Sequence, residues 1–185
     1  MPRLTTSEVR ERLAAWVWGW DTGAKRGGLG CIELATGRFA SYAAEWRPER
    51  EKGGAMPLSP SLKLAYQHTY DLASAVLHRY PLTVAVELAS GKPNPSLMFH
   101  GGVQILALEA ATGLAPWLIN VSTWKRVTGM GAKSDLLPWI AGLGYPIDDE
   151  DQAAGVAIAA GAAVEMYGFD LSKLHPVTQP ARRAA

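Results

Sequence analysis

Acidic residues stand at three places in the sequence where their surroundings favour chemistry over simple solvation. Asp21 closes the apolar run 15–20, and Glu87 lies at the end of a second apolar run, 82–88. A third group consists of four consecutive carboxylates before an alanine-rich segment: Asp148, Asp149, Glu150 and Asp151. A carboxylate at the end of an apolar strand is costly to bury unless it is paired or binds a metal ion. Asp21 and Glu87 are therefore candidate ligands, and the acidic group can add a third.

The chemistry that such carboxylates support is the binding of a divalent cation. If the two apolar runs are neighbouring strands, Asp21 and Glu87 converge at one edge of a sheet, and a later helix can bring Asp151 beside them. Several carboxylates at one point repel each other, and a divalent cation removes that repulsion. Hard oxygen ligands select Mg²⁺, with Mn²⁺ as the alternative. Two such ions about 3.5–4 Å apart form the usual clamp for in-line phosphodiester cleavage.

Each acidic position also has an ordinary structural explanation. Asp21 precedes Thr-Gly and is typical of a turn. Glu87 can pair with Lys92 or with a lysine elsewhere. The acidic group can cap a helix and complement its dipole. Residue types alone do not decide whether these carboxylates form a functional site or only stabilise the fold. The order of the helices and strands must decide between the two roles.

Hydrophobic patterning indicates the elements that must position these residues. Tryptophans at alternate positions of 15–20 predict a central strand. The segment GAKRGGLG after Asp21 predicts a glycine-rich turn, followed by two strands joined at Thr36-Gly37. Further along we expect a loop at 47–58, a helix from Ser59 that Pro81 ends, a strand over 82–88, a loop at 90–96, a helix in the second half of 97–113, a strand over 115–123, a basic loop with glycines over 124–133, and helices over 134–144 and 151–168.

This order, β-β-β-α-β-α-β-α-α, predicts an α/β fold. We expect a five-stranded mixed sheet, its first three strands antiparallel, with helices on both faces. Residues 1–14 are interpreted as an N-terminal extension, 15–170 as the domain and 171–185 as a C-terminal tail.

Composition narrows the class of protein. The 185 residues fit one domain and are 48% hydrophobic and 19% charged, which is ordinary for a globular protein. The single cysteine, Cys31, excludes an intrachain disulfide and a cysteine-based zinc site, and a reducing cytoplasm fits it. No stretch approaches the ~20 apolar residues of a membrane span, and the N-terminus is not a signal peptide. The net charge of +1 means that any binding to nucleic acid depends on local basic patches.

The opening segment WGWDTGAKRGGLGCIEL resembles that of RuvC-like Holliday junction resolvases of the RNase H-like superfamily. Asp21, Gly23, Gly28 and Gly30 fall at the matching places, although Thr22 stands where that family commonly has proline. VAVELASG resembles the strand on which RuvC-like proteins place their glutamate, here Glu87.

Two later segments extend the resemblance, which covers roughly residues 15–167. WKRVTGMGAKSD is similar to the RuvC segment with two functional lysines, and the candidates are Lys125 and Lys133, with a shorter gap than in that family. DQAAGVAIAA resembles the last helix, where RuvC has two aspartates three residues apart. Asp148 and Asp151 have that spacing, whereas aligning the alanine run puts Asp151 first and Ala154 second, and a third alignment puts Gln152 second. Asp151 is the first choice and Asp148 the second, with Asp149 as a further candidate.

The resemblance implies a structure-selective DNA endonuclease that uses a two-metal mechanism. It implies metal ligands Asp21, Glu87, Asp151 and Asp148, phosphate contacts from Lys125 and Lys133, and a homodimer that cuts branched DNA, four-way junctions above all. Seven tryptophans and six tyrosines are more than a core of this size needs and fit a subunit interface. Other candidate DNA contacts are Lys25, Arg26, Lys92, Phe99, His100, Arg126, the basic segment 47–52, Arg182 and Arg183.

Three alternatives accompany this interpretation. The Asp-x-Gly-x-Lys-Arg run containing Lys25 and Arg26 is also similar to YqgF-type nucleases, which implies an RNase or exonuclease, although Glu87 favours RuvC. The interpretation as a non-catalytic RNase H-like nucleic-acid-binding module is favoured if Gln152 stands in place of a metal ligand. An ATP-binding domain of the actin and hexokinase type also opens with Asp-x-Gly, but it needs two domains and a longer chain.

Overall fold

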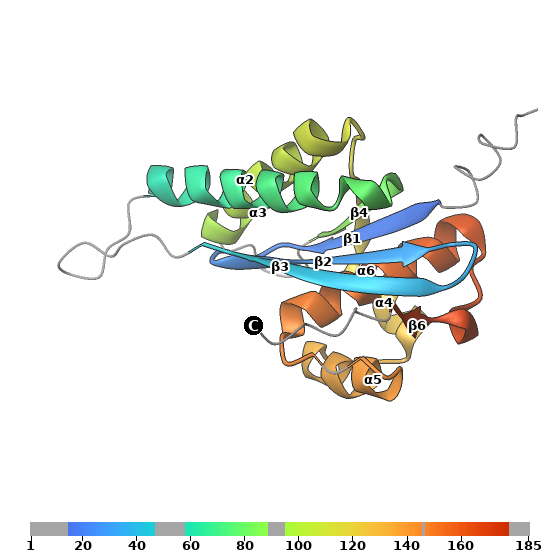
Figure 1. Ribbon diagram of the computed structural model, residues 1–185. Helices are drawn as coiled ribbons and strands as arrows, with labels where there is room; N and C mark the ends of the chain where they lie inside the picture. The colour runs from blue at the N-terminus through green and yellow to red at the C-terminus, as the bar shows by residue number, and fades with distance from the viewer. Residues whose placement is uncertain (1–14, 47–57, 89–94, 146, 178–185) are drawn as a thin grey trace, which may run out of the picture.

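A single mixed β-sheet forms the centre of the computed structural model, which describes residues 15–46, 58–88, 95–145 and 147–177 (Figure 1). The strand order is β5-β4-β1-β2-β3-β6. Strands β1, β2 and β3 are antiparallel, β4 and β5 run parallel to β1, and β6 runs parallel to β3. The strands span Trp16–Asp21 (β1), Arg26–Glu33 (β2), Arg38–Glu45 (β3), Pro81–Leu88 (β4), Trp117–Asn120 (β5) and His175–Pro176 (β6).

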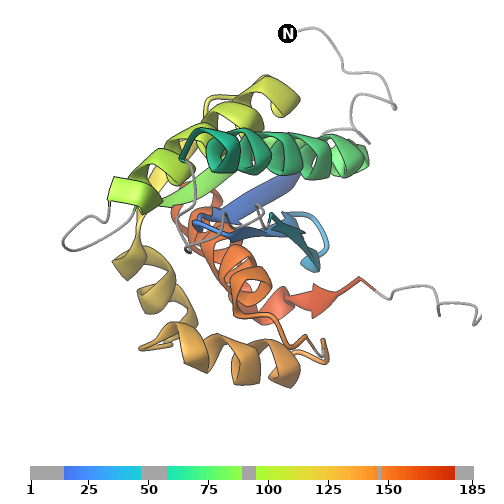
Figure 2. The same cartoon turned by 90° about the vertical axis from the view of Figure 1, so that its left-hand side faces the viewer.

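Helices cover both faces of this sheet. Helices α2 and α3 lie side by side on one face, whereas α6, with α4 and α5 beyond it, lies on the other (Figures 1 and 2). None of the helices among the described residues is long and apolar enough to cross a membrane. The helices span Leu58–Ala75 (α2), Pro95–Thr112 (α3), Val121–Thr128 (α4), Leu136–Gly142 (α5) and Glu150–Tyr167 (α6), with short 3-10 turns at Leu77–Arg79 (η1), Lys133–Asp135 (η2) and Leu171–Lys173 (η3).

The alternation along β1 divides the core into two clusters. Trp16, Trp18 and Trp20 belong to the cluster under α2 and α3, and Val17 belongs to the cluster under α6. Successive side chains of a strand point to opposite faces. Asp21, which has the same parity as Val17, is therefore on the α6 face.

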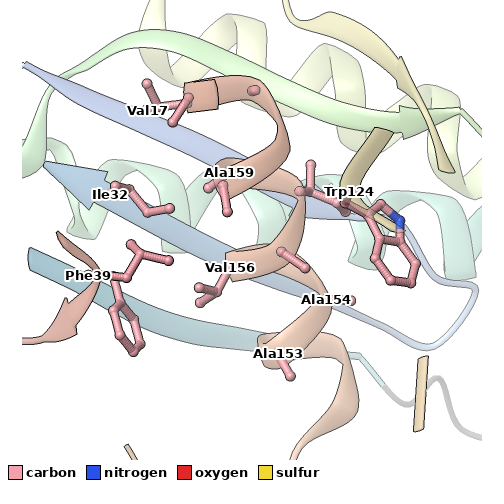
Figure 3. Close-up of a cluster of buried hydrophobic side chains, with 14 of the residues drawn as sticks. Val17, Ile32, Phe39, Trp124, Ala153, Ala154, Val156 and Ala159 are labelled. Atoms are coloured by element: carbon pink, nitrogen blue, oxygen red, sulfur yellow. The ribbon is translucent and has the colours of Figure 1, made fainter. Parts of the chain in front are cut away.

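Helix α6 packs on the sheet through small residues. Every residue from Ala153 to Ala163 is buried, and Figure 3 shows Val156 and Ala159 facing Val17 and Ile32 of the strands below. A Cβ atom added to Gly28 or Gly30 of β2 would collide with the α6 backbone. The helix and the strands therefore approach backbone to backbone, which fixes the height of α6 over the sheet within a narrow tolerance.

The expected mixed α/β fold, with three antiparallel strands first and helices on both faces, is confirmed. The sheet has six strands instead of the predicted five, because the two-residue β6 is too short to leave a hydrophobic pattern. The predicted glycine-rich turn after Asp21 is wrong in its second half, since β2 already begins at Arg26. Gly28 and Gly30 of this segment serve the close approach of α6.

The region after β5 also differs from the expectation. The predicted strand over 115–123 ends at Asn120, and the predicted basic loop over 124–133 begins as helix α4. Asn120 caps this helix, because its side chain accepts a hydrogen bond from the Ser122 backbone N–H at 3.0 Å. Gly129 ends the helix with φ of 74°. Lys125 and Arg126 are therefore presented by a helix.

Candidate active site

Asp21, Glu87 and Asp151 reach the same end of the sheet from three elements. Asp21 ends β1, and Glu87 lies one residue before the end of the parallel neighbour β4. Glu87 shares the parity of Ala85, a member of the α6-side cluster, so both carboxylates are on the α6 face. Asp151 is in the first turn of α6. This is the convergence that the sequence predicts.

Gly28 explains why Asp151 comes so close to Asp21. In the β1–β2 ladder Gly28 is the direct partner of Asp21. A Cβ atom on Gly28 would collide with the backbone carbonyl of Asp151, and one on Gly155 would lie 2.7 Å from the Gly28 carbonyl oxygen. Two glycines, one on the strand and one on the helix, therefore admit the N-terminus of α6 to the end of β1.

Lys133 lies between the two aspartates. Its Nζ donates to Asp21 Oδ2 at 2.6 Å and also to Asp151 Oδ1. The turn η2 that carries Lys133 is tied by the Ala132 backbone N–H, which donates to Asp135 Oδ2 at 2.8 Å. The ammonium group thus offsets part of the negative charge that two neighbouring carboxylates create.

Burial dominates the acid–base behaviour of Asp21, which is only 7% exposed. Desolvation, helped by the charges of Asp151 and Glu87, raises its pKa to about 7 against the opposing charge and hydrogen bond of Lys133. Although burial also acts to raise the pKa of Asp151, its hydrogen bond to Lys133 and the charges of Lys133 and Arg26 hold that pKa below its usual value. The pKa values of Asp21 and Asp151 are therefore shifted in opposite directions within one site.

Asp151 has further partners at the start of α6. The Arg26 guanidinium forms an ion pair with it and also lies 3.6 Å from Asp149. Asp149 is the N-cap, because its side chain accepts hydrogen bonds from the backbone N–H groups of Asp151 and Gln152. Gln152 lies on the sheet side, where Ser41 Oγ donates to its side-chain oxygen at 2.9 Å. Asp149 and Gln152 are therefore engaged in fold contacts, whereas Asp148 is exposed just before the cap.

Glu87 is held from the side of α4. The indole Nε1 of Trp124 donates to Glu87 Oε2 at 2.7 Å. Lys125 Nζ lies 5.6 Å from the centre of the same ring. Sequence reasoning missed Trp124, because its contact with β4 depends on the unexpected helix α4.

The remaining predicted nucleic-acid contacts divide by exposure. Lys25 and Arg126 are exposed, and Phe99 on α3 is 56% exposed. His100 is only 2% exposed, with Nε2 2.6 Å from Ser61 Oγ and Nδ1 2.7 Å from the Ser96 carbonyl oxygen. Both ring nitrogens are thus engaged inside the α2–α3 layer, and no base can stack on this ring as it lies. Lys92, the segment 47–52, Arg182 and Arg183 lie outside the described residues.

The donor set suits a hard divalent cation in its chemistry. Three carboxylates from separate elements converge, and the burial cost at Asp21 is the kind that a cation offsets. As the side chains stand, no three acidic, histidine or cysteine side chains among the described residues are close enough to share an ion. Lys133 occupies the position between Asp21 and Asp151, so an ion bound by both would replace it or move it aside.

Comparison with known proteins yields matches in structure alone. No protein-family model matches the sequence, and no curated protein matches it. A structure of Thermus thermophilus RuvC in complex with a Holliday junction substrate superimposes with a TM-score of 0.61 at 20% identity, over 84% of this chain and 98% of that one. Another Thermus thermophilus RuvC structure gives a TM-score of 0.59 at 21% identity, over 80% and 92%. The predicted resemblance to RuvC is confirmed at the level of the fold.

Proposed function

We propose that this protein is a structure-selective DNA endonuclease of the Holliday junction resolvase type. The observation that carries the proposal is the meeting of Asp21 and Asp151 at Lys133, with Glu87 close enough to Asp21 for its charge to raise the pKa of that carboxyl. The fold shared with a RuvC structure that holds a Holliday junction substrate supports branched DNA as the substrate. The reducing cytoplasm remains its predicted location, from Cys31 alone.

Asp21, Glu87 and Asp151 would hold Mg²⁺ or Mn²⁺, with Asp148 as the candidate fourth ligand. When bound, such ions activate the attacking water and offset the charge on the reacting phosphate. Asp21 contributes a buried carboxylate with a pKa of about 7, which gives up its proton as a cation arrives. Glu87 and Asp151 approach from separate elements, so the ligand set is rigid only when α4 and α6 are in place.

Lys133 has two roles in this proposal. Without DNA it neutralises Asp21 and Asp151, and with DNA it contacts the phosphate next to the scissile bond. Its position on a short turn beside Gly131 allows the long side chain to change partners without a movement of α6. Lys125, on the neighbouring helix α4, would contact a phosphate further along the same strand.

The DNA-binding surface would extend from these lysines over Lys25, Arg26 and Arg126. Phe99 remains a candidate for stacking on an unpaired base at a junction, an interaction worth about 1–3 kcal/mol. His100 is left out of this surface because it is buried. Lys92, 47–52, Arg182 and Arg183 remain predictions. Binding that rests on these cations should weaken steeply with salt.

A homodimer would present two such sites to one junction. Besides Phe99, helix α3 exposes two large apolar side chains, Met98 and Leu106, of which Met98 is 57% exposed. Two-fold symmetry would match the symmetry of a four-way junction. Sedimentation velocity at micromolar concentration should show a dimer, and a protein that stays monomeric would argue for a general nuclease.

A non-catalytic nucleic-acid-binding module is the second candidate. It is favoured by one observation: Lys133 and Arg26 already satisfy Asp21 and Asp151 without an ion. In that case the protein would bind branched nucleic acid but leave it intact at every Mg²⁺ or Mn²⁺ concentration.

The test is a cleavage assay on single-stranded, duplex, forked and four-way-junction DNA, with an RNA duplex added for the YqgF-type alternative. We expect junction cleavage that needs Mg²⁺ or Mn²⁺.

Asp21→Asn should abolish cleavage and retain or strengthen DNA binding, because less negative charge then faces the phosphate. Asp71→Asn, an exposed position on α2, is the matched control and should cut at the wild-type rate. An Asp21→Asn variant that still cuts would end the proposal, and preferential RNA cleavage would favour the alternative.

A further inference from the structure

Trp124 occupies an unusual position for a large aromatic residue. It is only 3% exposed although it lies on the eight-residue helix α4. Its indole N–H points to a carboxylate, Glu87 Oε2 at 2.7 Å, and its ring face lies 5.6 Å from Lys125 Nζ. One side chain therefore contacts one residue of the proposed metal site and one lysine of the proposed phosphate contact.

The chemistry of the indole determines what this contact can do. An indole N–H can only donate, so the Glu87 oxygen that it meets must be an acceptor. The bond fixes the rotation of the Glu87 side chain. A cation over the ring face is attracted by the same π-system. The contact thus selects the orientation of Glu87.

The place of Trp124 is set by the helix that carries Asp151. A Cβ atom on Gly161 of α6 would lie 3.3 Å from the Trp124 Cα, so α4 rests directly on α6. Trp124 belongs to the same buried cluster as the alanines of α6, and Figure 3 shows its ring beside that helix. Because Gly28 fixes the other end of the same helix, α6 positions Asp151 directly and Glu87 through Trp124.

We propose that Trp124 is the positioning residue for Glu87: it holds the carboxylate oriented toward the site shared with Asp21 and Asp151. This inference rests on the proposed function. It predicts that the indole N–H, and not merely the bulk of the ring, is required for full affinity toward a divalent cation.

The test measures Mn²⁺ binding to the full chain without DNA, by calorimetry. Trp124→Phe keeps an aromatic ring but removes the N–H, and it should weaken Mn²⁺ binding about 10-fold, the effect usual for loss of a hydrogen bond that orients a ligand. Trp139→Phe is the matched control, since Trp139 packs at the edge of the same core cluster. It should leave the Mn²⁺ dissociation constant unchanged.

A double-mutant cycle tests whether the effect passes through Glu87. In a Glu87→Ala background, Trp124→Phe should cause little further loss of Mn²⁺ affinity, because the partner of the indole is already absent. The indole N–H resonance of Trp124, assigned from its disappearance in Trp124→Phe, should move upfield in Glu87→Ala. This spectroscopic measurement needs neither metal nor DNA.

The outcomes separate the inference from the proposed function. Unchanged Mn²⁺ affinity in Trp124→Phe, equal losses in both tryptophan variants, or an indole resonance that ignores Glu87→Ala would each overturn the role of Trp124 alone. Should Trp124→Phe not fold, the indole resonance is assigned by triple-resonance NMR of the wild-type protein, and its shift in Glu87→Ala still decides. A wild-type protein that binds no Mn²⁺ would overturn the proposed function and this inference together.

Discussion

The two faces of the sheet are packed with side chains of very different size. On the α6 face, glycines and alanines bring a helix backbone against the backbone of β1 and β2. On the α2–α3 face, Trp16, Trp18 and Trp20 fill the space between strand and helix with large rings. The carboxylates of the candidate site lie on the first face, and the exposed apolar side chains of α3 lie on the second.

The size of the packed side chains on each face determines how closely that face fixes the position of its residues. Backbone contact leaves no flexible side chain to absorb a shift, so it positions a functional group such as Asp151 closely. Large side chains can adjust their rotamers when a neighbour changes, so that face tolerates substitution better. We therefore expect small changes on the α6 face to abolish function, and larger changes on the α2–α3 face to affect mainly stability.

Gly28→Ala should have the largest effect. The added methyl group would collide with the Asp151 carbonyl and push the start of α6 away from Asp21. Overpacking of this kind destabilises by about 3 kcal/mol. We expect cleavage to be lost and Mn²⁺ binding to weaken together, measured by the junction assay and by calorimetry at a temperature where the variant remains folded.

A second glycine supplies the control for this substitution. Gly102 lies within α3, and a Cβ atom added there meets nothing within 4 Å. Gly102→Ala should therefore stabilise the protein by about 0.5–1 kcal/mol and leave Mn²⁺ affinity unchanged. If Gly28→Ala behaved like Gly102→Ala, the close approach of α6 would not be what positions Asp151.

Trp18→Phe addresses the aromatic face. Trp18 is fully buried, and its indole N–H donates to the Arg79 carbonyl oxygen at 2.8 Å. Loss of this bond and of part of the ring should lower the free energy of unfolding by about 2 kcal/mol. Urea denaturation would measure the loss. Mn²⁺ affinity should stay at the wild-type value, and a parallel fall in affinity would contradict the division of roles between the faces.

The same contrast explains which features could be predicted from the sequence. Asp21 and Glu87 were accessible because each interrupts an apolar run, a signal confined to one strand. The sequence ranked Asp151 before Asp148 without deciding between them, since three alignments differ by one or a few residues. The contact between Gly28 and α6 is what brings Asp151 to Asp21. Trp124 and the burial of His100 depend on contacts between segments 37 or more residues apart, which no local pattern encodes.

The last prediction concerns a proton released when the metal binds. Because the pKa of Asp21 is about 7 without metal, binding of Mn²⁺ at pH 7 should release about half a proton from this group, and less at higher pH. Affinity should rise with pH up to about 7 and then level off.

The raised pKa also means that protonated Asp21 favours the folded state, so the stability of the metal-free protein should fall as pH rises from about 4 to about 7. Calorimetry in two buffers of different ionisation enthalpy, and urea denaturation in a chelator at about pH 5 and about pH 8, measure the two quantities. Asp21→Asn should remove both effects. Cys31 of the aromatic face contributes nothing in this range, because burial raises the pKa of its thiol and keeps it neutral. A wild-type protein whose Mn²⁺ affinity and stability are flat across this interval would show that Asp21 is already ionised, and that Lys133 rather than a proton balances its charge.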